Sequence, residues 1–198
     1  MKTGFRFLLP AALFALLPIP ASAEWKSVEQ VQTYIVAGNT GAELYASIGE
    51  RGPEVGQGRA IAHTTFKLTW SRQYEPRGNA CVLASARPKL ILTYTLPTPA
   101  ARLPASAQSS WETFLDGVHR HELVHGQMIK DMVMAIEAAS VGMTTNDDPD
   151  CRKIRVDLTK RLGELSAKQR QRSRDFDQAE LSEGGNIHRL VLGLVNGP

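Results

Sequence analysis

The sequence predicts an α+β fold, in which a small antiparallel or mixed sheet is followed by two long helices. In the first half of the chain, short runs of β-branched and aromatic residues alternate with glycine, proline and polar stretches, which is typical of strands and turns. In the second half, apolar residues recur at helical spacing over two long stretches. Strands that come first and helices that follow are typical of the α+β class.

The chain begins with a predicted secretory signal peptide over residues 1–23. Lys2 and Arg6 precede a short apolar run that ends in a small-x-small sequence at Ala23. A membrane anchor is the alternative, but three prolines interrupt the run, and a spanning helix needs about 20 apolar residues. We therefore expect cleavage after Ala23, export to the periplasm or the extracellular space, and no stable membrane insertion of the mature chain.

Length and charge limit the number of domains and the kinds of partner expected for the mature chain. Residues 24–198 make up 175 of the 198 residues, a length that suits one domain with a sizeable core. The formal net charge is +3, and removal of Lys2 and Arg6 with the signal leaves about +1. Such a small positive charge does not indicate nucleic acid as a partner.

The two cysteines predict a disulfide bond. Cys81 and Cys151 are the whole cysteine content of a chain that is expected to meet an oxidising compartment. Two zinc thiolates are the alternative, but neither cysteine has a CxxC partner.

The elements of the first half follow from local patterns. Strands are expected over three runs of β-branched or alternating apolar residues: 31–38, 63–71 and 81–97. A short helix follows the first of them, because Thr40 and Glu43 have the spacing of a capping box. Pro88 lies within the last strand and confines part of it to an edge or a bulge.

The elements of the second half are two long helices. The first is expected over about 109–141, where Ser109 and Glu112 have the spacing of a second capping box. The second is expected over about 150–178, after the break TTNDDPD, with apolar residues on one face and many charges on the other.

The stretch HELVH lies on the expected apolar stripe of the first long helix. His121 and His125 are i and i+4, so both imidazoles lie on one face and can reach one metal ion. Glu122 interrupts the same stripe, and an unpaired buried carboxylate is costly. A zinc ion with a bound water would compensate, because the histidines bind the metal and Glu122 holds the water. His119 lies about 200° round the helix from His121 and is expected to face solvent.

A catalytic zinc ion needs a third protein ligand. Glu183 is the first candidate and His188 the second, because they flank a Gly-Gly turn that a helix hairpin would bring back over the site. Asp131 has the third-ligand spacing of the metzincin pattern, but an unbroken helix directs it away from the histidines. Glu137 lies too far along the same helix.

Several stretches spread over most of the mature chain point to one family. They are YIVAGNTGAELYASIGERGP, AHTTFKLTW, the isolated Cys81, Trp111 ahead of HELVH, and Cys151. In these stretches the chain resembles a bacterial family described as a domain of unknown function and as predicted secreted zinc-dependent proteases of the zincin type. The resemblance implies a zincin-like fold, paired cysteines, both motif histidines as zinc ligands and the motif glutamate as the catalytic residue.

The tail departs from the pattern of that family. Many members carry a Tyr-Asp segment followed closely by His-Gly. Here Phe176-Asp177 keeps the first part, and Glu183 stands before the glycines in place of a histidine. This departure favours a glutamate as the third ligand.

Together these features predict an exported zinc metallopeptidase that hydrolyses peptide bonds through a zinc-bound water. Glu122 is expected to take the proton as general base and to pass it to the leaving amine. Tyr94 and His188 are candidates to stabilise the oxyanion, with a core position as the leading alternative for Tyr94. A strand edge within 89–97 is a candidate to hold the peptide or protein substrate by strand addition.

Three other functions fit the same residues. A zinc-binding envelope interaction module without catalysis would have a closed site of four ligands, whereas a catalytic site keeps one position open. A zinc hydrolase could act on another bond, such as a cell-wall amide. A structural domain without metal would bury the histidines as core residues, and metal analysis separates it from the rest.

Overall fold

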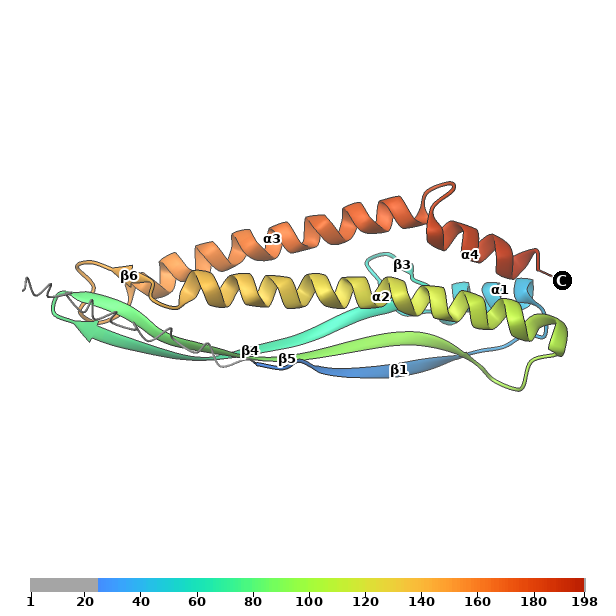
Figure 1. Cartoon of the computed structure of the whole chain (residues 1–198), viewed down its shortest axis with the longest axis horizontal. Helices are drawn as coiled ribbons and strands as arrows, with labels where there is room; N and C mark the ends of the chain where they lie inside the picture. The colour runs from blue at the N-terminus through green and yellow to red at the C-terminus, as the bar shows by residue number, and fades with distance from the viewer. Residues whose placement is uncertain (1–24, 198) are drawn as a thin grey trace, which may run out of the picture.

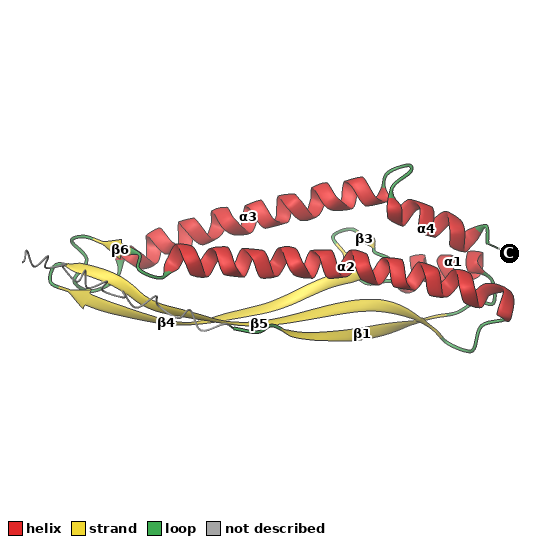
Figure 2. Ribbon diagram, viewed as in Figure 1, coloured by secondary structure: helices red, strands yellow, loops and turns green. Residues whose placement is uncertain are grey.

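The computed structural model describes residues 25–197, and the α+β prediction is confirmed over this range (Figures 1 and 2). The predicted signal peptide lies outside the described residues. In chain order the elements are β1 (Val28–Val36), α1 (Gly41–Arg51), β2 (Glu54–Val55), β3 (Gly58–Arg59), β4 (His63–Arg77), β5 (Ala80–Pro99), α2 (Ala105–Ser140), β6 (Thr144–Thr145), α3 (Lys153–Leu181) and α4 (Asn186–Val195).

The main sheet is mixed and has the strand order β1-β5-β4. β4 and β5 form a long antiparallel hairpin, and β1 pairs with β5 in parallel from Ile91 onward. Most of 89–97 is therefore in the middle of the sheet, so the expectation of a free edge there is wrong. Pro88 pairs with Trp70 of β4 but precedes the part of β5 that pairs with β1. Proline has no backbone N–H, so at this position it removes no hydrogen bond between β5 and β1.

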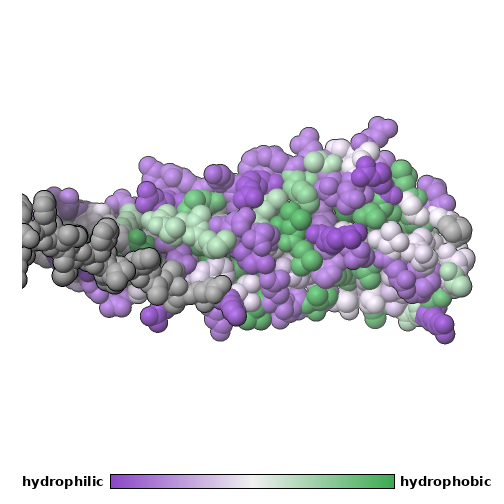
Figure 3. All heavy atoms as spheres, in the orientation of Figure 1, coloured by the Kyte–Doolittle hydropathy of each residue, from purple (hydrophilic) through white to green (hydrophobic). Residues whose placement is uncertain are grey.

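The two long helices cover one side of this sheet (Figure 2). α2 lies between the sheet and α3, and α3 runs antiparallel to α2 (Figure 1). Polar and charged side chains cover much of the outer side of α3 (Figure 3). Among residues 25–197, no helix combines the length and the apolar character that crossing a membrane requires.

The helix boundaries correct one of the two capping boxes. Thr40 and Glu43 form the expected box at the start of α1. α2 begins earlier than expected, directly after Pro104, so Ser109 and Glu112 lie inside the helix and form no box. The fixed φ of proline suits a helix entrance, and the residues after it, Ala105 and Ser106, do not oppose a helical start.

Packing fixes α2 against the strands and against α4. Tyr94 of β5 is 2% exposed and contacts Gly126 of α2, where any larger side chain would overlap the tyrosine hydroxyl. Gly117 gives the same close approach to Leu190 of α4. The first contact positions α2 on the sheet, and the second positions it against α4.

The predicted disulfide is confirmed. Cys81, near the start of β5, is bonded to Cys151, two residues before α3. Beside it, the Asp148 carboxylate accepts hydrogen bonds from the backbone of the residues that open α3: Arg152, Lys153 and Ile154. Burial alone would raise the pKa of Asp148, but these bonds hold it below its ordinary value. The disulfide thus ties the segment between α2 and α3 to the sheet.

Candidate metal centre

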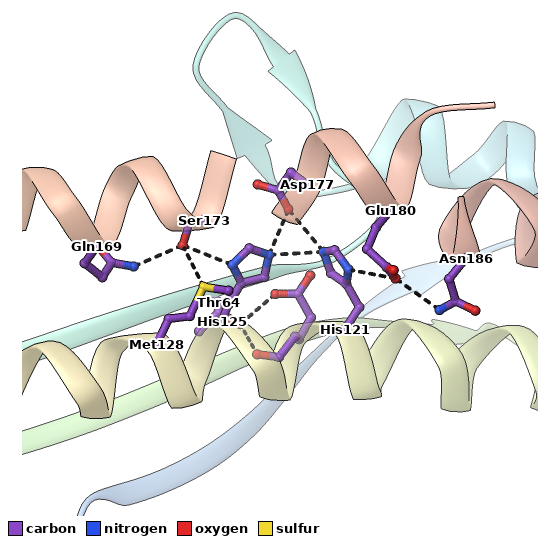
Figure 4. Close-up of polar contacts among 10 residues, drawn as sticks. Thr64, His121, His125, Met128, Gln169, Ser173, Asp177, Glu180 and Asn186 are labelled. Atoms are coloured by element: carbon purple, nitrogen blue, oxygen red, sulfur yellow. Dashed lines mark hydrogen bonds and ion pairs between the residues drawn. The ribbon is translucent and has the colours of Figure 1, made fainter. Parts of the chain in front are cut away.

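The HELVH motif lies in the middle of α2, on the side that is shielded from solvent. His121 is 8% exposed and Glu122 is 5% exposed, on a stripe that continues to buried Val118 and Ile129. His121 and His125 project side by side from one face of α2 toward α3 (Figure 4). Glu122 points toward β4.

The third member of the centre is Asp177 of α3. Its Oδ1 lies 2.8 Å from Nε2 of His125 and 3.2 Å from Nε2 of His121. The two Nε2 atoms are 3.1 Å apart. Three donor atoms therefore converge on one point between the helices (Figure 4). Within the described part of the chain, these residues form the one group of His, Cys, Asp and Glu donors close enough to share a metal ion.

The spacing and chemistry of these donors fit zinc. Ligand atoms about 2.0–2.2 Å from a tetrahedral zinc ion lie roughly 3.3–3.6 Å from one another. The three separations in this centre are slightly shorter, so small side-chain movements would admit the ion. Imidazole nitrogens and a carboxylate oxygen are donors that zinc accepts.

The charges of the centre also favour a cation. Burial alone would raise the pKa of Asp177, but hydrogen bonds from His121 and His125 and their positive charge hold it well below its ordinary value. Burial alone would lower the pKa of His125, and the hydrogen bond and charge of Asp177, with the charge of Glu122, outweigh it and raise that pKa. A centre that stabilises positive charge on an imidazole would also stabilise a metal ion.

Glu122 belongs to the same site without joining the donor group. Its Oε2 accepts a hydrogen bond of 2.6 Å from the hydroxyl of Thr64, near the start of β4. The same hydroxyl lies 3.2 Å from the backbone carbonyl of Glu122. This threonine orients the buried carboxylate beside the histidines.

Two further side chains of α3 hold the imidazoles. The ring of Phe176 stacks on His121, with ring centroids 4.7 Å apart and an angle of 19° between the planes. The Ser173 hydroxyl lies 3.2 Å from Nδ1 of His125 and accepts a hydrogen bond from Gln169.

A cavity of about 540 Å³ opens beside the centre. The donor group, Glu122 and Thr64 all line it. Its apolar wall comes from several elements and consists of Val55, Ile61, Phe66, Val118, Ile129, Leu181 and Ile187. Polar groups that converge in a largely apolar cavity are typical of sites that bind small molecules or cofactors.

The structure brings Asp177 to the histidines in place of the predicted third ligands. α3 continues to Leu181, so Glu183 lies in the exposed turn after it, and α4 then continues in the same general direction (Figure 1). His188 accepts a hydrogen bond from the backbone of Gly184 through Nδ1. The turn does not fold back over the site, which is the physical reason for the correction.

The other candidates on α2 have separate partners. Asp131 accepts a hydrogen bond from Gln127 and lies 3.6 Å from the guanidinium of Arg172. Glu137 accepts a hydrogen bond from the Trp25 indole. Both lie off the centre, as the helix geometry predicts.

Two further residues that the sequence singled out, Tyr94 and His119, lie outside the donor group. The Tyr94 hydroxyl donates a hydrogen bond to Glu29, and burial together with that carboxylate raises the pKa of Tyr94. Tyr94 is therefore a core residue, as its leading alternative had it, and no oxyanion partner. His119 lies outside the donor group as expected, but it is half-buried and packs edge-on against Tyr94, with ring centroids 6.1 Å apart, instead of facing solvent.

Of the two site residues that the sequence did not predict, Asp177 and Thr64, only the first carries a signal in the sequence. Asp177 belongs to the Phe176-Asp177 segment, which stands where many members of the family that the chain resembles carry Tyr-Asp. Thr64 carries no comparable signal, because a threonine in a strand is ordinary.

A family model described as "Bacterial protein of unknown function (DUF922)" matches residues 31–185. The match covers most of the chain, and the chain belongs to this family. No curated protein and no solved structure matches the chain.

Proposed function

We propose that the chain is an exported zinc-dependent metallopeptidase with a zincin-like arrangement of its site. The observation that carries this proposal is the convergence of His121, His125 and Asp177, with Glu122 against the same cavity. Three protein ligands are typical of a catalytic zinc centre, whereas structural centres use four. The disulfide and the predicted signal peptide support export.

The donor group would hold the ion through Nε2 of each histidine and Oδ1 of Asp177. Bound zinc would supply a Lewis acid for the scissile carbonyl and lower the pKa of water to about 7. Glu122 would act as the general base and then pass the proton to the leaving amine. The Thr64 hydroxyl would keep the Glu122 carboxylate oriented toward the reacting atoms.

The free edge of β4 is the place where we propose that an extended peptide binds. Within the described sheet, β4 pairs only with β5, so its other side offers backbone groups for strand addition. His63, Thr64 and Phe66, at the start of β4, line the cavity. A peptide added there would run past the metal centre, and a side chain could enter the apolar cavity.

Metal analysis and a digest test the proposal together. Mature protein is expected to contain about one zinc ion per chain, and His121→Ala or His125→Ala should lose it. Zinc-loaded protein should cleave members of a peptide library, and a chelator should stop the cleavage. Full zinc occupancy in the double histidine variant would refute the centre. A loaded protein that cleaves no peptide would refute the peptidase and favour the interaction module or the cell-wall hydrolase.

A further inference from the structure

One face of α3 matches the two histidines of α2 residue by residue. Ser173, Asp177 and Glu180 lie four and three residues apart, so they form one row on this face. Because α3 is antiparallel to α2, Ser173 lies by His125 and Glu180 lies by His121, with Asp177 between them (Figure 4). The inner nitrogen of each ring thus faces Asp177, and the outer nitrogen faces an end of the row.

The outer nitrogen of His121 is incompletely satisfied. Nδ1 of His121 is buried and has no hydrogen-bond partner among the described residues. The carboxylate oxygen Oε2 of Glu180 lies 3.7 Å away, just beyond hydrogen-bond distance. The side chain of Glu180 is 22% exposed, and the Asn186 amide donates a hydrogen bond of 3.1 Å to the same oxygen.

A metal ion on Nε2 would change what Nδ1 requires. A histidine that binds metal through one nitrogen carries its proton on the other, and that N–H is almost always donated to a carboxylate, carbonyl or water. Glu180 is the carboxylate placed to accept it, after an approach of about 1 Å to the usual length of a charge-assisted hydrogen bond.

We infer that Glu180 is the positioning residue of His121. Its carboxylate accepts the Nδ1 proton, which fixes the tautomer and aims Nε2 at the metal. Glu180 faces the outer nitrogen, so it supports a ligand and is not itself a fourth ligand. Asn186, the first residue of α4, holds the carboxylate, and this makes the turn between α3 and α4 part of the support. The inference rests on the zinc centre of the proposed function, but not on peptidase activity.

Zinc affinity tests the inference without any activity assay. Glu180→Ala is expected to weaken zinc binding about 10–100-fold in competition with a chromophoric chelator. Glu180→Gln keeps the size and an acceptor oxygen but loses the charge, so a smaller loss is expected. Glu164→Gln, an exposed substitution elsewhere on α3, is the matched control and should bind zinc like the wild type.

A second readout separates positioning of the ring from general damage to the fold. In zinc-loaded wild type, nitrogen NMR of His121 should show a protonated Nδ1 in a strong hydrogen bond, and the signal of that proton should shift in both Glu180 variants. The melting temperature without zinc should change little. Wild-type zinc affinity in Glu180→Ala, or an unshifted proton signal, would overturn the role of Glu180. If the wild type itself binds no zinc, the proposed function fails as well, so the two failures are distinguishable.

Discussion

Replacement of Glu122 by glutamine decides most sharply whether the centre is catalytic. The substitution keeps the shape of the side chain, and the amide oxygen can still accept the hydrogen bond that Thr64 donates at 2.6 Å. The histidines and Asp177 are untouched, so zinc content should stay at the wild-type level. What disappears is the proton acceptor.

The expected loss of activity follows from the role of the base. General-base catalysis contributes about 10²–10⁴-fold, or roughly 3–5 kcal/mol of activation free energy. Glu122 is 5% exposed, so the substitution also removes a charge from a buried position. Burial disfavours the charged group, and the melting temperature should therefore be unchanged or higher. A large loss of activity without loss of zinc or stability would be specific to the base.

The assay compares wild type, Glu122→Gln and Glu112→Gln on one peptide library, each checked for zinc. Glu112 is an exposed glutamate of the same helix, so its variant controls for a lost charge on α2. Equal cleavage by wild type and Glu122→Gln would remove Glu122 from the mechanism. If the control loses as much as Glu122→Gln, the effect belongs to the helix as a whole.

Three further predictions concern the metal, the disulfide and pH. Asp177→Ala should weaken zinc binding by more than the ~10–100-fold expected when a residue that only supports a ligand is removed. Glu183→Ala should leave zinc binding unchanged. The opposite result by metal analysis would place the third ligand in the turn after α3. Loss of the Cys81–Cys151 bond, which spans a sequence separation of 70, should cost about 4 kcal/mol in urea unfolding. Two titratable thiols in native exported protein would contradict that pairing. Because the pKa of His125 is raised, zinc binding near pH 7 should release protons, and zinc affinity should fall as the pH drops through that raised pKa. Calorimetry in buffers of different ionisation enthalpy measures this release. A binding enthalpy that is the same in all of these buffers would contradict it.

The features that depend only on residues close together in the chain could be predicted without the structure. The helical period places His121 and His125 on one face whatever the helix packs against. The separation of four residues was therefore enough to predict that the two imidazoles lie together. The capping box of Thr40 and Glu43 is equally local, because both hydrogen bonds join residues three apart. Both cysteines were paired correctly because there were only two of them.

Which distant residues come to lie against those local features depends on the packing of the whole chain. Asp177 is 52 residues from His125 along the chain and reaches it only because α3 packs antiparallel on α2 in one register. That register depends on the loop, the disulfide and the packing of many side chains, and no local pattern encodes it. The order of the strands in the sheet could not be predicted for the same reason. β5 lies in the middle because β1 pairs with it in parallel, and such a pairing joins segments more than 60 residues apart. Thr64 reaches Glu122 for the same reason, because strand order and helix register together bring β4 beside the motif.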